Sequence, residues 1–262
     1  MILHNIINEE KSYLNGEPRV FFSPGRVNLI GEHIDYLGGR VFPTAINLGT
    51  YAIVTPREDT DFHFLSYNFK LNGTKIVSLD HLDYQKDRNW ANYPAGMIEA
   101  FVAKGLRINH GLNIIIYGTL PNGAGLSSSA SLEVLIGVVL RDMYQFDIPM
   151  IDIVQIAQRV ENTYIGVNCG IMDQFAVGMS KENNAIYLDT STLEYELIPL
   201  ILKDYVIVIG NTTKKRALAD SKYNERRREC DDGLKVVQTV YPDVKNVCDL
   251  TVKQFDNVSE IF

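Results

Sequence analysis

The feature that most constrains the fold is a strand, a glycine-rich turn and a helix that follow one another directly. Residues 111–118, "GLNIIIYG", are a short β-branched run typical of a buried strand. The turn contains "GAGLSSSAS", Gly123 to Ser131, and apolar residues at helical spacing predict a helix over residues 127–144. Because glycines ahead of a helix leave backbone N–H groups open to an anion, this turn is a candidate anion site.

This turn fits neither of the two common phosphate-binding patterns. A P-loop ends in Gly-Lys-Ser/Thr, and no Gly-Lys pair stands here. A dinucleotide-binding turn has the order G-x-G-x-x-G, and Ser128 occupies the position of the third glycine. One serine is enough to cap a helix, whereas Ser127, Ser128 and Ser129 stand in a row here. The stretch alone leaves two interpretations open, a capped helix and a phosphate loop with spare hydroxyls.

Composition and charge exclude several classes of protein. The chain has 262 residues and a net charge of -7, which disfavours a nucleic-acid binder because such proteins usually carry a basic face. Its three cysteines, Cys169, Cys230 and Cys248, are far apart, so neither a disulfide framework nor a zinc site is expected. We expect no signal peptide and no membrane-spanning segment, and therefore a cytoplasmic protein without a membrane partner.

Strand patterns dominate the first half of the chain and helical patterns its middle, which favours an α+β fold. Strands are predicted near residues 19–31, 40–46, 50–57, 61–69, 73–79, 111–118, 184–189, 195–200 and 205–212. Helices are predicted near residues 1–16, 89–105, 127–144 and 150–166, and from Ser221 onward. The last residues, "LTVKQFDNVSEIF", read as the entry to one more helix, and we expect a C-terminal portion to be missing.

Polar side chains gather in "PGRVNLIGEHIDYLGG", Pro24 to Gly39. Arg26, Glu32, His33 and Asp35 fall within ten residues that glycines bound on both sides. This mixture suits a sugar, because hydroxyl groups need donors and acceptors together and each carboxylate accepts several hydrogen bonds. A solvated polar turn is the alternative. A metal site is disfavoured, since only one histidine is present and no His-x-x-x-His spacing exists.

The stretch "RVENTYIGVNCGIMDQF", residues 159–175, contains two further candidate carboxylates. Glu161 stands on a helix whose other face is apolar, and Asp173 follows Gly166 and Gly170. An aspartate on a glycine-permitted turn is placed for general-base work or for cation binding. The alternative for Asp173 is the cap of the helix that follows it.

A fourth stretch, "KKRALADSKYNERRREC", Lys214 to Cys230, mixes basic and acidic residues and reads as a solvated helix, with Tyr223 as a candidate sugar contact. The four stretches together, in their order along the chain, resemble the galactokinases of the GHMP small-molecule kinase superfamily. "GRVNLIGEHIDY" resembles the galactokinase signature and "GAGLSSSAS" the phosphate loop of the superfamily, while "CGIMDQF" and "SKYNERRREC" resemble galactokinase sequence. Ile34 and Leu37 depart from the signature, and we expect neither to carry chemistry, although Leu37 would remove a polar contact at the sugar pocket. The resemblance implies a GHMP kinase fold with an N-terminal domain over residues 1–183 and an incomplete C-terminal domain over residues 184–262.

The resemblance also implies an activity, the transfer of the γ-phosphoryl group of ATP to the anomeric hydroxyl of galactose with Mg²⁺ as cofactor. An N-acetylgalactosamine kinase and a non-catalytic sensor of galactose and ATP are the alternatives. The pocket residues do not decide between the two sugars. We expect the complete protein to be a monomer.

Roles for single residues follow from the same resemblance. Asp173 is the implied general base, and Arg26 lies beside it and the γ-phosphate. The residues implied to hold galactose are Glu32, His33, Asp35, Gly170 and Tyr223. The residues implied to hold ATP are Gly123, Ala124, Gly125, Leu126, Ser127, Ser128 and Ser129, with Trp90 at the adenine. Ser129 and Glu161 are the implied ligands of Mg²⁺. A place in the core is the alternative for Trp90.

Overall fold

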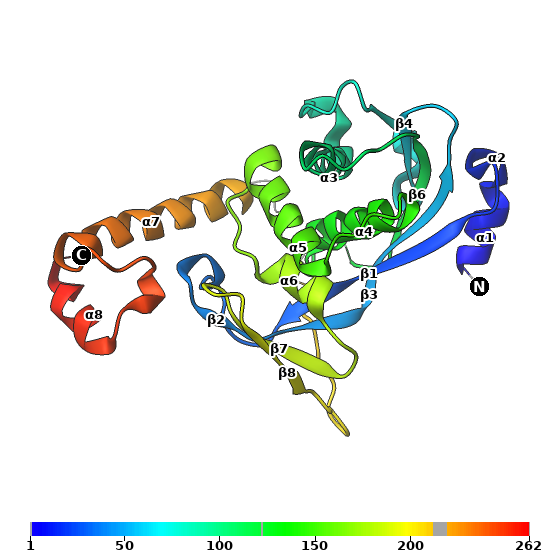
Figure 1. The fold of residues 1–262 in the computed structure, drawn as a ribbon. Helices are drawn as coiled ribbons and strands as arrows, with labels where there is room; N and C mark the ends of the chain where they lie inside the picture. Colours follow the sequence, from blue (N-terminus) through cyan, green and yellow to red (C-terminus); the bar gives the residue numbers. More distant parts are fainter. Residues whose placement is uncertain (1, 122, 212–218, 262) are drawn as a thin grey trace.

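The structure is a computed structural model, and it describes residues 2–121, 123–211 and 219–261, with the side chains of residues 219–221 and 260 left aside. These residues form two sheets, and helices cover both faces of the larger sheet (Figure 1). This mixture confirms the predicted α+β class. Among the described residues, no helix combines the length and apolar character needed to cross a bilayer.

The larger sheet has five strands in the order β1-β3-β6-β4-β5. Their bounds are β1 Arg19–Asn28, β3 Pro43–Pro56, β6 Leu112–Gly118, β4 Asp61–Ser66 and β5 Lys75–Ser78. Strands β4 and β6 are parallel, and the other neighbours are antiparallel. Side chains alternate between the two faces, so Ile114 and Ile116 join the main core while Ile115 packs with Ile6 on the opposite face.

Strand β1 is bulged at the Ser-Pro-Gly interruption seen in the sequence. Its register against β3 shifts between Pro24 and Arg26. A Cβ atom at Gly25 would lie 2.8 Å from the carbonyl oxygen of Leu126, and the N–H of Arg26 donates to that oxygen at 3.3 Å. The missing side chain at Gly25 therefore allows the bulge to touch the glycine-rich turn, and it brings Arg26 beside it.

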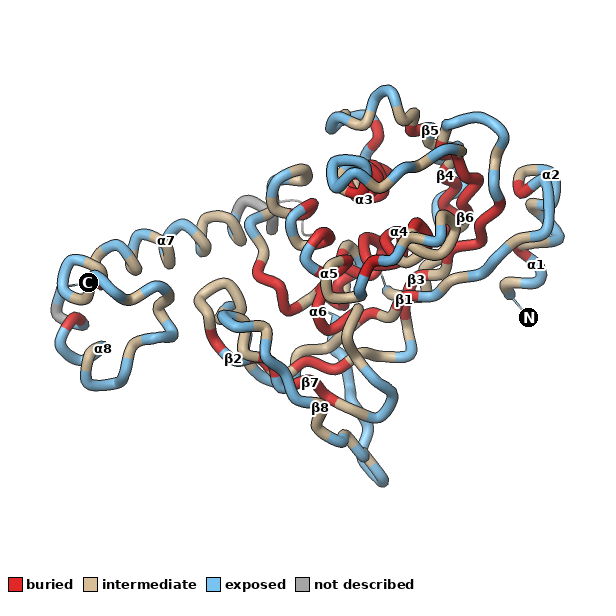
Figure 2. The backbone as a smooth tube through the Cα atoms, in the orientation of Figure 1, coloured by how far each residue is buried: buried red, intermediate tan, exposed pale blue. Residues whose placement is uncertain are grey.

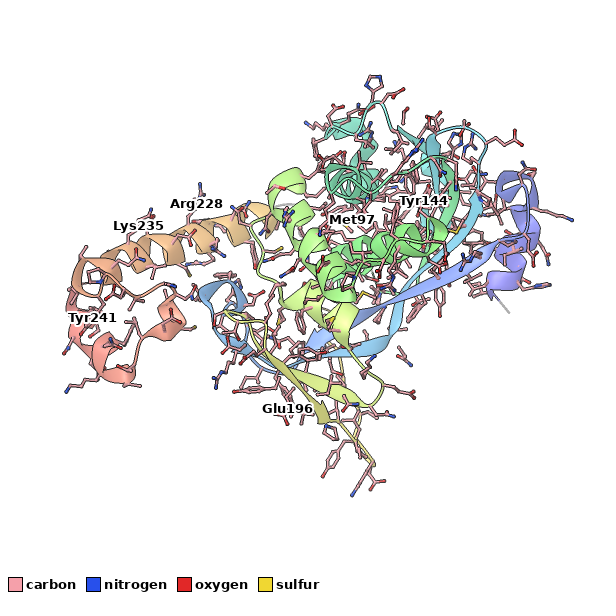
Figure 3. All side chains as sticks on the ribbon, viewed as in Figure 1. Met97, Tyr144, Glu196, Arg228, Lys235 and Tyr241 are labelled. Carbon is pink, nitrogen blue, oxygen red and sulfur yellow. The ribbon has the colours of Figure 1, made fainter. Side chains whose placement is uncertain are left out.

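Helix α4 lies at the centre of the main core. It spans Ser128–Met143, follows the predicted bounds, and is buried over most of its length (Figure 2). Helices α3 (Asn92–Ala103) and α5 (Met150–Arg159) pack around it, and side chains fill the space between α3 and α4 near the labelled Met97 (Figure 3). Helices α1 (Ile2–Glu9) and α2 (Lys11–Leu14) cover the other face of the sheet.

The smaller sheet has the order β2-β7-β8, and its strands are Arg40–Val41, Asn184–Asp189 and Tyr195–Pro199. Helix α6 (Met172–Met179) covers it through a core that contains Phe175, Ile186 and Leu188. Strand β2 comes from the first predicted domain and β7 from the second. The division at residue 183 stays a prediction.

The strand predicted over residues 205–212 is wrong for the part that the structure describes, residues 205–211, while residue 212 lies outside the described residues. Tyr205, Val206 and Val208 are 80%, 80% and 84% exposed. A strand forms only when a neighbour accepts and donates its backbone hydrogen bonds. No described strand pairs with this segment, so its β-branched residues do not suffice.

Helix α7 (Ala219–Val240) projects from the body and carries the last elements of the chain, η5 (Val247–Asp249) and α8 (Val252–Val258) (Figure 1). The predicted entry to a further helix is confirmed, because Thr251 and Gln254 form a reciprocal capping box at the start of α8. The remaining short helices are η1 Asp35–Leu37, η2 Tyr67–Asn72, η3 Lys86–Ala91, η4 Val160–Ile165 and η6 Ser259–Ile261.

Candidate functional site

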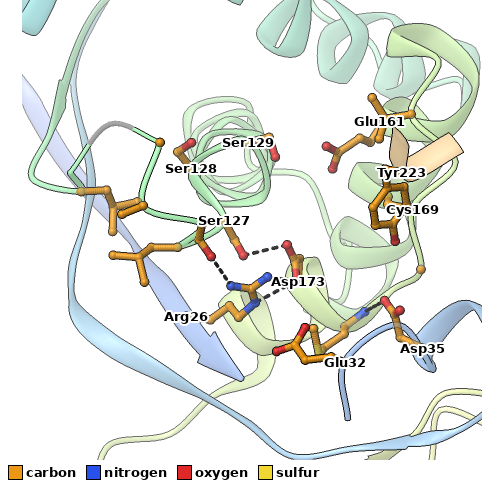
Figure 4. Close-up of a pocket in the computed structure, with 18 of the residues that line it drawn as sticks. Arg26, Glu32, Asp35, Ser127, Ser128, Ser129, Glu161, Cys169, Asp173 and Tyr223 are labelled. Atoms are coloured by element: carbon orange, nitrogen blue, oxygen red, sulfur yellow. Dashed lines mark hydrogen bonds and ion pairs between the residues drawn. The ribbon is translucent and has the colours of Figure 1, made fainter. Parts of the chain in front are cut away.

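A cavity of about 390 Å³ opens between the bulge of β1, the glycine-rich turn, the start of α6 and the start of α7 (Figure 4). Every predicted site residue except Trp90 lines it. These are Arg26, Glu32, His33, Asp35, Gly123, Ala124, Gly125, Leu126, Ser127, Ser128, Ser129, Glu161, Gly170, Asp173 and Tyr223. The fold therefore brings the four sequence stretches to one place.

Asp173 is held at both of its carboxylate oxygens. Nε of Arg26 donates to Oδ1 at 2.8 Å, and the hydroxyl of Ser127 donates to Oδ2 at 2.7 Å. Nη1 of Arg26 also donates to the carbonyl oxygen of Gly125 at 2.8 Å, which joins the ion pair to the turn. Asp173 lies in the first turn of α6, and its carboxylate points at Arg26 rather than capping the helix (Figure 4).

Ser127 adopts a backbone conformation that is rare for a residue with a side chain. It stands at the N-cap of α4 with φ +58° and ψ +51°, and its side chain makes no capping hydrogen bond. The hydroxyl is directed to Asp173 instead of the backbone of α4, and the predicted contact of Ser127 with ATP stays a prediction. A left-handed serine costs free energy, and such strain concentrates where a site demands it.

Glu161 lies in a short π-helical segment, η4, that continues α5. The sequence predicted one regular helix to residue 166, and the extra residue per turn in η4 is a feature that often marks functional positions. The side chain of Glu161 is buried, and its carboxylate faces Ser129 (Figure 4). Burial raises the pKa of Glu161 to about 7, and the charge of Asp173 adds to that effect.

Two buried residues beside Glu161, Gln174 and Glu133, were not predicted from the sequence. Nε2 of Gln174 donates to Glu161 at 2.7 Å and lies 3.4 Å from a carboxylate oxygen of Glu133. Glu133 is fully buried, and burial together with the charge of Glu161 raises its pKa well above the ordinary value. Glu133 stands one turn after Ser129 and between the apolar Leu132 and Val134, and an acidic residue within such a run was a signal that could have found it.

Asp35 and Gly170 form the other wall of the cavity. The backbone N–H of Met172 donates to Oδ2 of Asp35 at 3.3 Å. A Cβ atom at Gly170 would overlap the Asp35 carboxylate, so only glycine leaves room for it. Burial raises the pKa of Asp35 to about 6, with a contribution from the charge of Asp173. Nearby, Glu32 accepts a hydrogen bond from the amide of Asn28 at 3.0 Å.

Three aromatic rings meet at the mouth of the cavity. Nδ1 of His33 lies 2.7 Å from the hydroxyl of Tyr36, and the rings of His33 and Tyr223 are 5.6 Å apart. Tyr223 reaches this place from α7. Leu37, by contrast, lines a separate apolar cavity of about 250 Å³ with residues of α7 and α8. The expectation that Leu37 removes a polar contact at the sugar pocket is therefore wrong, because its side chain lies outside that pocket.

Trp90 lines a second cavity of about 420 Å³. Its ring packs edge-on against Phe64 at 6.4 Å, so it borders the core and the cavity at once. Tyr93, Ser128 and Ser129 line both cavities. The two cavities therefore adjoin at the start of α4.

The side chains at the junction provide oxygen donors of the kind that Mg²⁺ prefers. Ser129 offers a hydroxyl and Glu161 a carboxylate, and a hydrogen bond joins them. Within residues 2–121, 123–211 and 219–261, no group of three or more His, Cys, Asp or Glu is arranged to hold a metal ion by itself. This donor set fits a cation that keeps several waters and takes further ligands from a phosphate.

Comparison with known proteins adds to this geometry. A family model described as GHMP kinases N terminal domain matches residues 92–181, and one described as galactokinase galactose-binding signature matches residues 10–56. The structure of Methanococcus jannaschii mevalonate kinase aligns with a TM-score of 0.63 at 18% identity, covering 94% of this chain and 79% of that one. The fold is that of the GHMP kinases.

Relatives with a higher sequence identity show to which family of GHMP kinases the chain belongs. Galactokinase from Fusobacterium nucleatum is 51% identical over 98% of this chain and 67% of its own length, and that from Clostridium beijerinckii is 52% identical over 95% and 64%. The crystal structure of Lactococcus lactis galactokinase complexed with galactose aligns with a TM-score of 0.95 at 43% identity, over all of this chain and 68% of that one. The chain belongs to the galactokinase family, and it spans about two thirds of the length of these relatives.

Proposed function

We propose that this protein transfers the γ-phosphoryl group of ATP to the anomeric hydroxyl of galactose. The observation that carries the proposal is the position of Asp173. Its carboxylate is fixed by Arg26 and Ser127 at the boundary between the polar wall around Asp35 and the glycine-rich turn. One of these surfaces is suited to bind a sugar and the other to bind phosphates. A carboxylate between them is placed to remove the proton from a sugar hydroxyl that attacks a phosphoryl group.

Asp173 holds the sugar hydroxyl by accepting its hydrogen bond, and it takes the proton as the new bond to phosphorus forms. Arg26 holds the carboxylate in one direction through its hydrogen bond to Oδ1. The same guanidinium offsets the negative charge that develops on the transferring phosphoryl oxygens. Fixing the direction of the carboxylate contributes to the rate, because the base then stands in place when the hydroxyl attacks.

The sugar is bound by groups on the other wall. Asp35 and Glu32 accept hydrogen bonds from hydroxyls, and His33 completes the set as donor or acceptor. Gly170 leaves the space that the sugar ring needs beside Asp35. Tyr223 covers a face of the ring, because aromatic rings stack on the C–H groups of a sugar.

The nucleotide occupies both cavities. Backbone N–H groups of residues 123–129 meet the phosphates at the start of α4, where the helix dipole also favours negative charge. The base lies in the second cavity beside Trp90. Ser129 and Glu161 would hold Mg²⁺, which when bound supplies positive charge to the phosphates.

The cysteines bear on the location of the protein. Cys169, Cys230 and Cys248 are free thiols, which supports a location in the reducing cytoplasm.

The direct test uses this chain extended to the full length of its galactokinase relatives, of which it spans about two thirds. It measures ADP release with Mg²⁺ and ATP in the presence of galactose, N-acetylgalactosamine or no sugar. We expect galactose to stimulate release, and phosphorus NMR to show a phosphate at the anomeric carbon. Asp173→Asn should abolish turnover while sugar binding persists in calorimetry. The matched control is Asp189→Asn, because Asp189 also pairs with an arginine, Arg40, but lies outside both cavities.

Three results would contradict the proposal in different ways. A stronger stimulation of ADP release by N-acetylgalactosamine than by galactose would show that N-acetylgalactosamine is the preferred substrate. Binding of galactose and ATP without turnover, unchanged in Asp173→Asn, would indicate a sensor. The absence of both sugar binding and ADP release would overturn the proposed function.

A further inference from the structure

Among the described side chains of helix α7, that of Tyr223 lines the cavity, although most of the helix lies outside the body of the protein (Figure 1). Its first turns are tied to the body in two places. The side chain of Asn224 donates to the carbonyl oxygen of Gly166 at 3.0 Å and accepts from the N–H of Asn168 at 3.0 Å. The second place is the segment of residues 33–39, which also carries His33 and Asp35 into the cavity.

Tyr36 is the residue through which this segment meets α7. Its hydroxyl lies 2.7 Å from Nδ1 of His33, and its ring lies 5.7 Å from that of Tyr223 at an interplanar angle of 77°. The guanidinium of Arg227 lies 5.1 Å from the centre of the same ring. Tyr36 is absent from the residues that line the cavity. Tyr36 therefore lies outside the cavity and contacts two residues that line it, His33 of its own segment and Tyr223 of α7.

The residues that follow Tyr36 extend the same contact. Leu37 lines the apolar cavity with Cys230 and Val237 of α7. A Cβ atom at Gly38 would lie 2.6 Å from the side chain of Asn246, so the backbone packs directly on the segment after α7. Gly38 also has a φ of +75°, which glycine adopts without strain. The segment thus docks on the C-terminal helices over several consecutive residues.

We propose that Tyr36 is a positioning residue that couples the docking of α7 to the shape of the sugar pocket. Its hydroxyl sets the orientation of the His33 ring, and its ring fixes Tyr223 through an edge contact that Arg227 supports on the other side. When α7 docks, His33 and Tyr223 take up their places together. This inference rests on the proposed function, because it concerns the same sugar site.

The test compares Tyr36→Phe, Tyr36→Ala and Arg227→Met with the unsubstituted chain, and Tyr205→Phe is the matched control since Tyr205 is 80% exposed. Calorimetry measures the Kd for galactose and for an ATP analogue separately. Tyr36→Phe keeps the ring contacts and should weaken galactose about threefold, whereas Tyr36→Ala should weaken it about tenfold or more. The Kd for the ATP analogue should stay within about twofold in every variant.

A second measurement does not depend on any ligand. Hydrogen exchange should show that the amides of residues 33–39 and 222–232 lose protection together in Tyr36→Ala, while those of α5 stay protected. Unchanged galactose binding in Tyr36→Ala, equal weakening of sugar and nucleotide, or loss of protection in only one of the two segments would overturn the coupling. If the unsubstituted chain binds no galactose, the proposed function fails, and joint loss of protection still supports the coupling by itself.

Discussion

Ser127 donates its hydroxyl to Oδ2 of Asp173 at 2.7 Å, so the first serine of the glycine-rich turn binds the proposed base directly. The two residues belong to the starts of different helices, α4 and α6. A change in the turn therefore changes the direction of the carboxylate. In the proposed reaction, this hydrogen bond links the turn that meets the phosphates to the carboxylate that removes the proton.

The first prediction uses the left-handed conformation of Ser127. Both Ser127→Ala and Ser127→Gly remove the hydroxyl, and we expect kcat to fall about tenfold in each because one hydrogen bond to the base is lost. Only glycine relieves the backbone strain, so the free energy of unfolding of Ser127→Gly should exceed that of Ser127→Ala by about 1 kcal/mol. Steady-state kinetics and denaturant unfolding measure the two effects. Equal stability of the two variants would contradict the strain.

The second prediction concerns Gln174. Its side-chain amide lies between Glu133 and Glu161 and donates to the latter at 2.7 Å. In Gln174→Leu the buried carboxyl groups lose this donor, and the free energy of unfolding should fall by about 1 to 3 kcal/mol at pH 7. Isothermal denaturation measures the loss. A variant as stable as the unsubstituted chain would show that another group, such as Ser129, satisfies Glu161.

The third prediction tests the close approach at Gly170. In Gly170→Ala the new methyl group displaces the Asp35 carboxylate, and we expect the galactose Kd to rise at least about tenfold because a cavity acceptor is misplaced. Gly210→Ala is the matched control, since a Cβ atom at Gly210 meets nothing within 4 Å. Calorimetry with galactose measures both. Unweakened binding by Gly170→Ala would exclude Asp35 from the sugar contacts.

The fourth prediction is a dependence of stability on pH. The pKa of Asp35 is raised from 3.8 to about 6 in the folded protein, so between these pH values the folded state holds the proton more tightly than the unfolded state. Stability from this group is therefore greatest below pH 3.8 and decreases as the pH rises to about 6. The contribution amounts to roughly 2 to 3 kcal/mol.

Asp35→Asn isolates this contribution. The difference in unfolding free energy, variant minus unsubstituted chain, should grow between pH 4 and about 6 and then stay level, because the amide does not ionise. Urea denaturation of both proteins at several pH values measures it. A difference that does not change with pH would show that the carboxyl of Asp35 titrates at its ordinary value.

The fifth prediction uses Trp90, the single tryptophan of the chain, as an intrinsic probe. Trp90 lines the second cavity and lies outside the first. Its fluorescence should therefore change when ATP binds and stay nearly constant when galactose alone binds. The reverse pattern would contradict the placement of the base in the second cavity. Tryptophan emission during titration with each ligand measures this.

Short motifs allowed much of the site to be predicted. Arg26 and Asp173 each stand in a glycine-bounded polar stretch, which made them candidates, whereas their roles followed only from the resemblance to the galactokinases. Helix α4 could be predicted because its apolar residues keep a clear 3.6-residue period. The composition of these stretches and the period of α4 are local properties of the sequence, so predicting them required no knowledge of contacts between distant residues.

Other features depend on contacts between distant segments. The hydroxyl of Ser127 turns to Asp173 rather than to its own helix, and only the packing of α6 on α4 decides this. The π-helical turn around Glu161 adds one residue to a pattern that looks regular in sequence. Residues 205–211 have strand composition, yet the absence of a described neighbouring strand outweighs that propensity. Leu37 stands beside sugar-site residues in sequence but points to another cavity.

The ion pair of Arg26 and Asp173 joins residues that are 147 positions apart in the chain. A ribosome that synthesises the protein exposes the strand β1 long before it exposes the start of α6. During that interval the nascent chain contains the sugar signature and the glycine-rich turn without the carboxylate that unites them. The proposed reaction centre therefore cannot form before residue 173 has left the ribosome, when most of the chain that surrounds it has already been made.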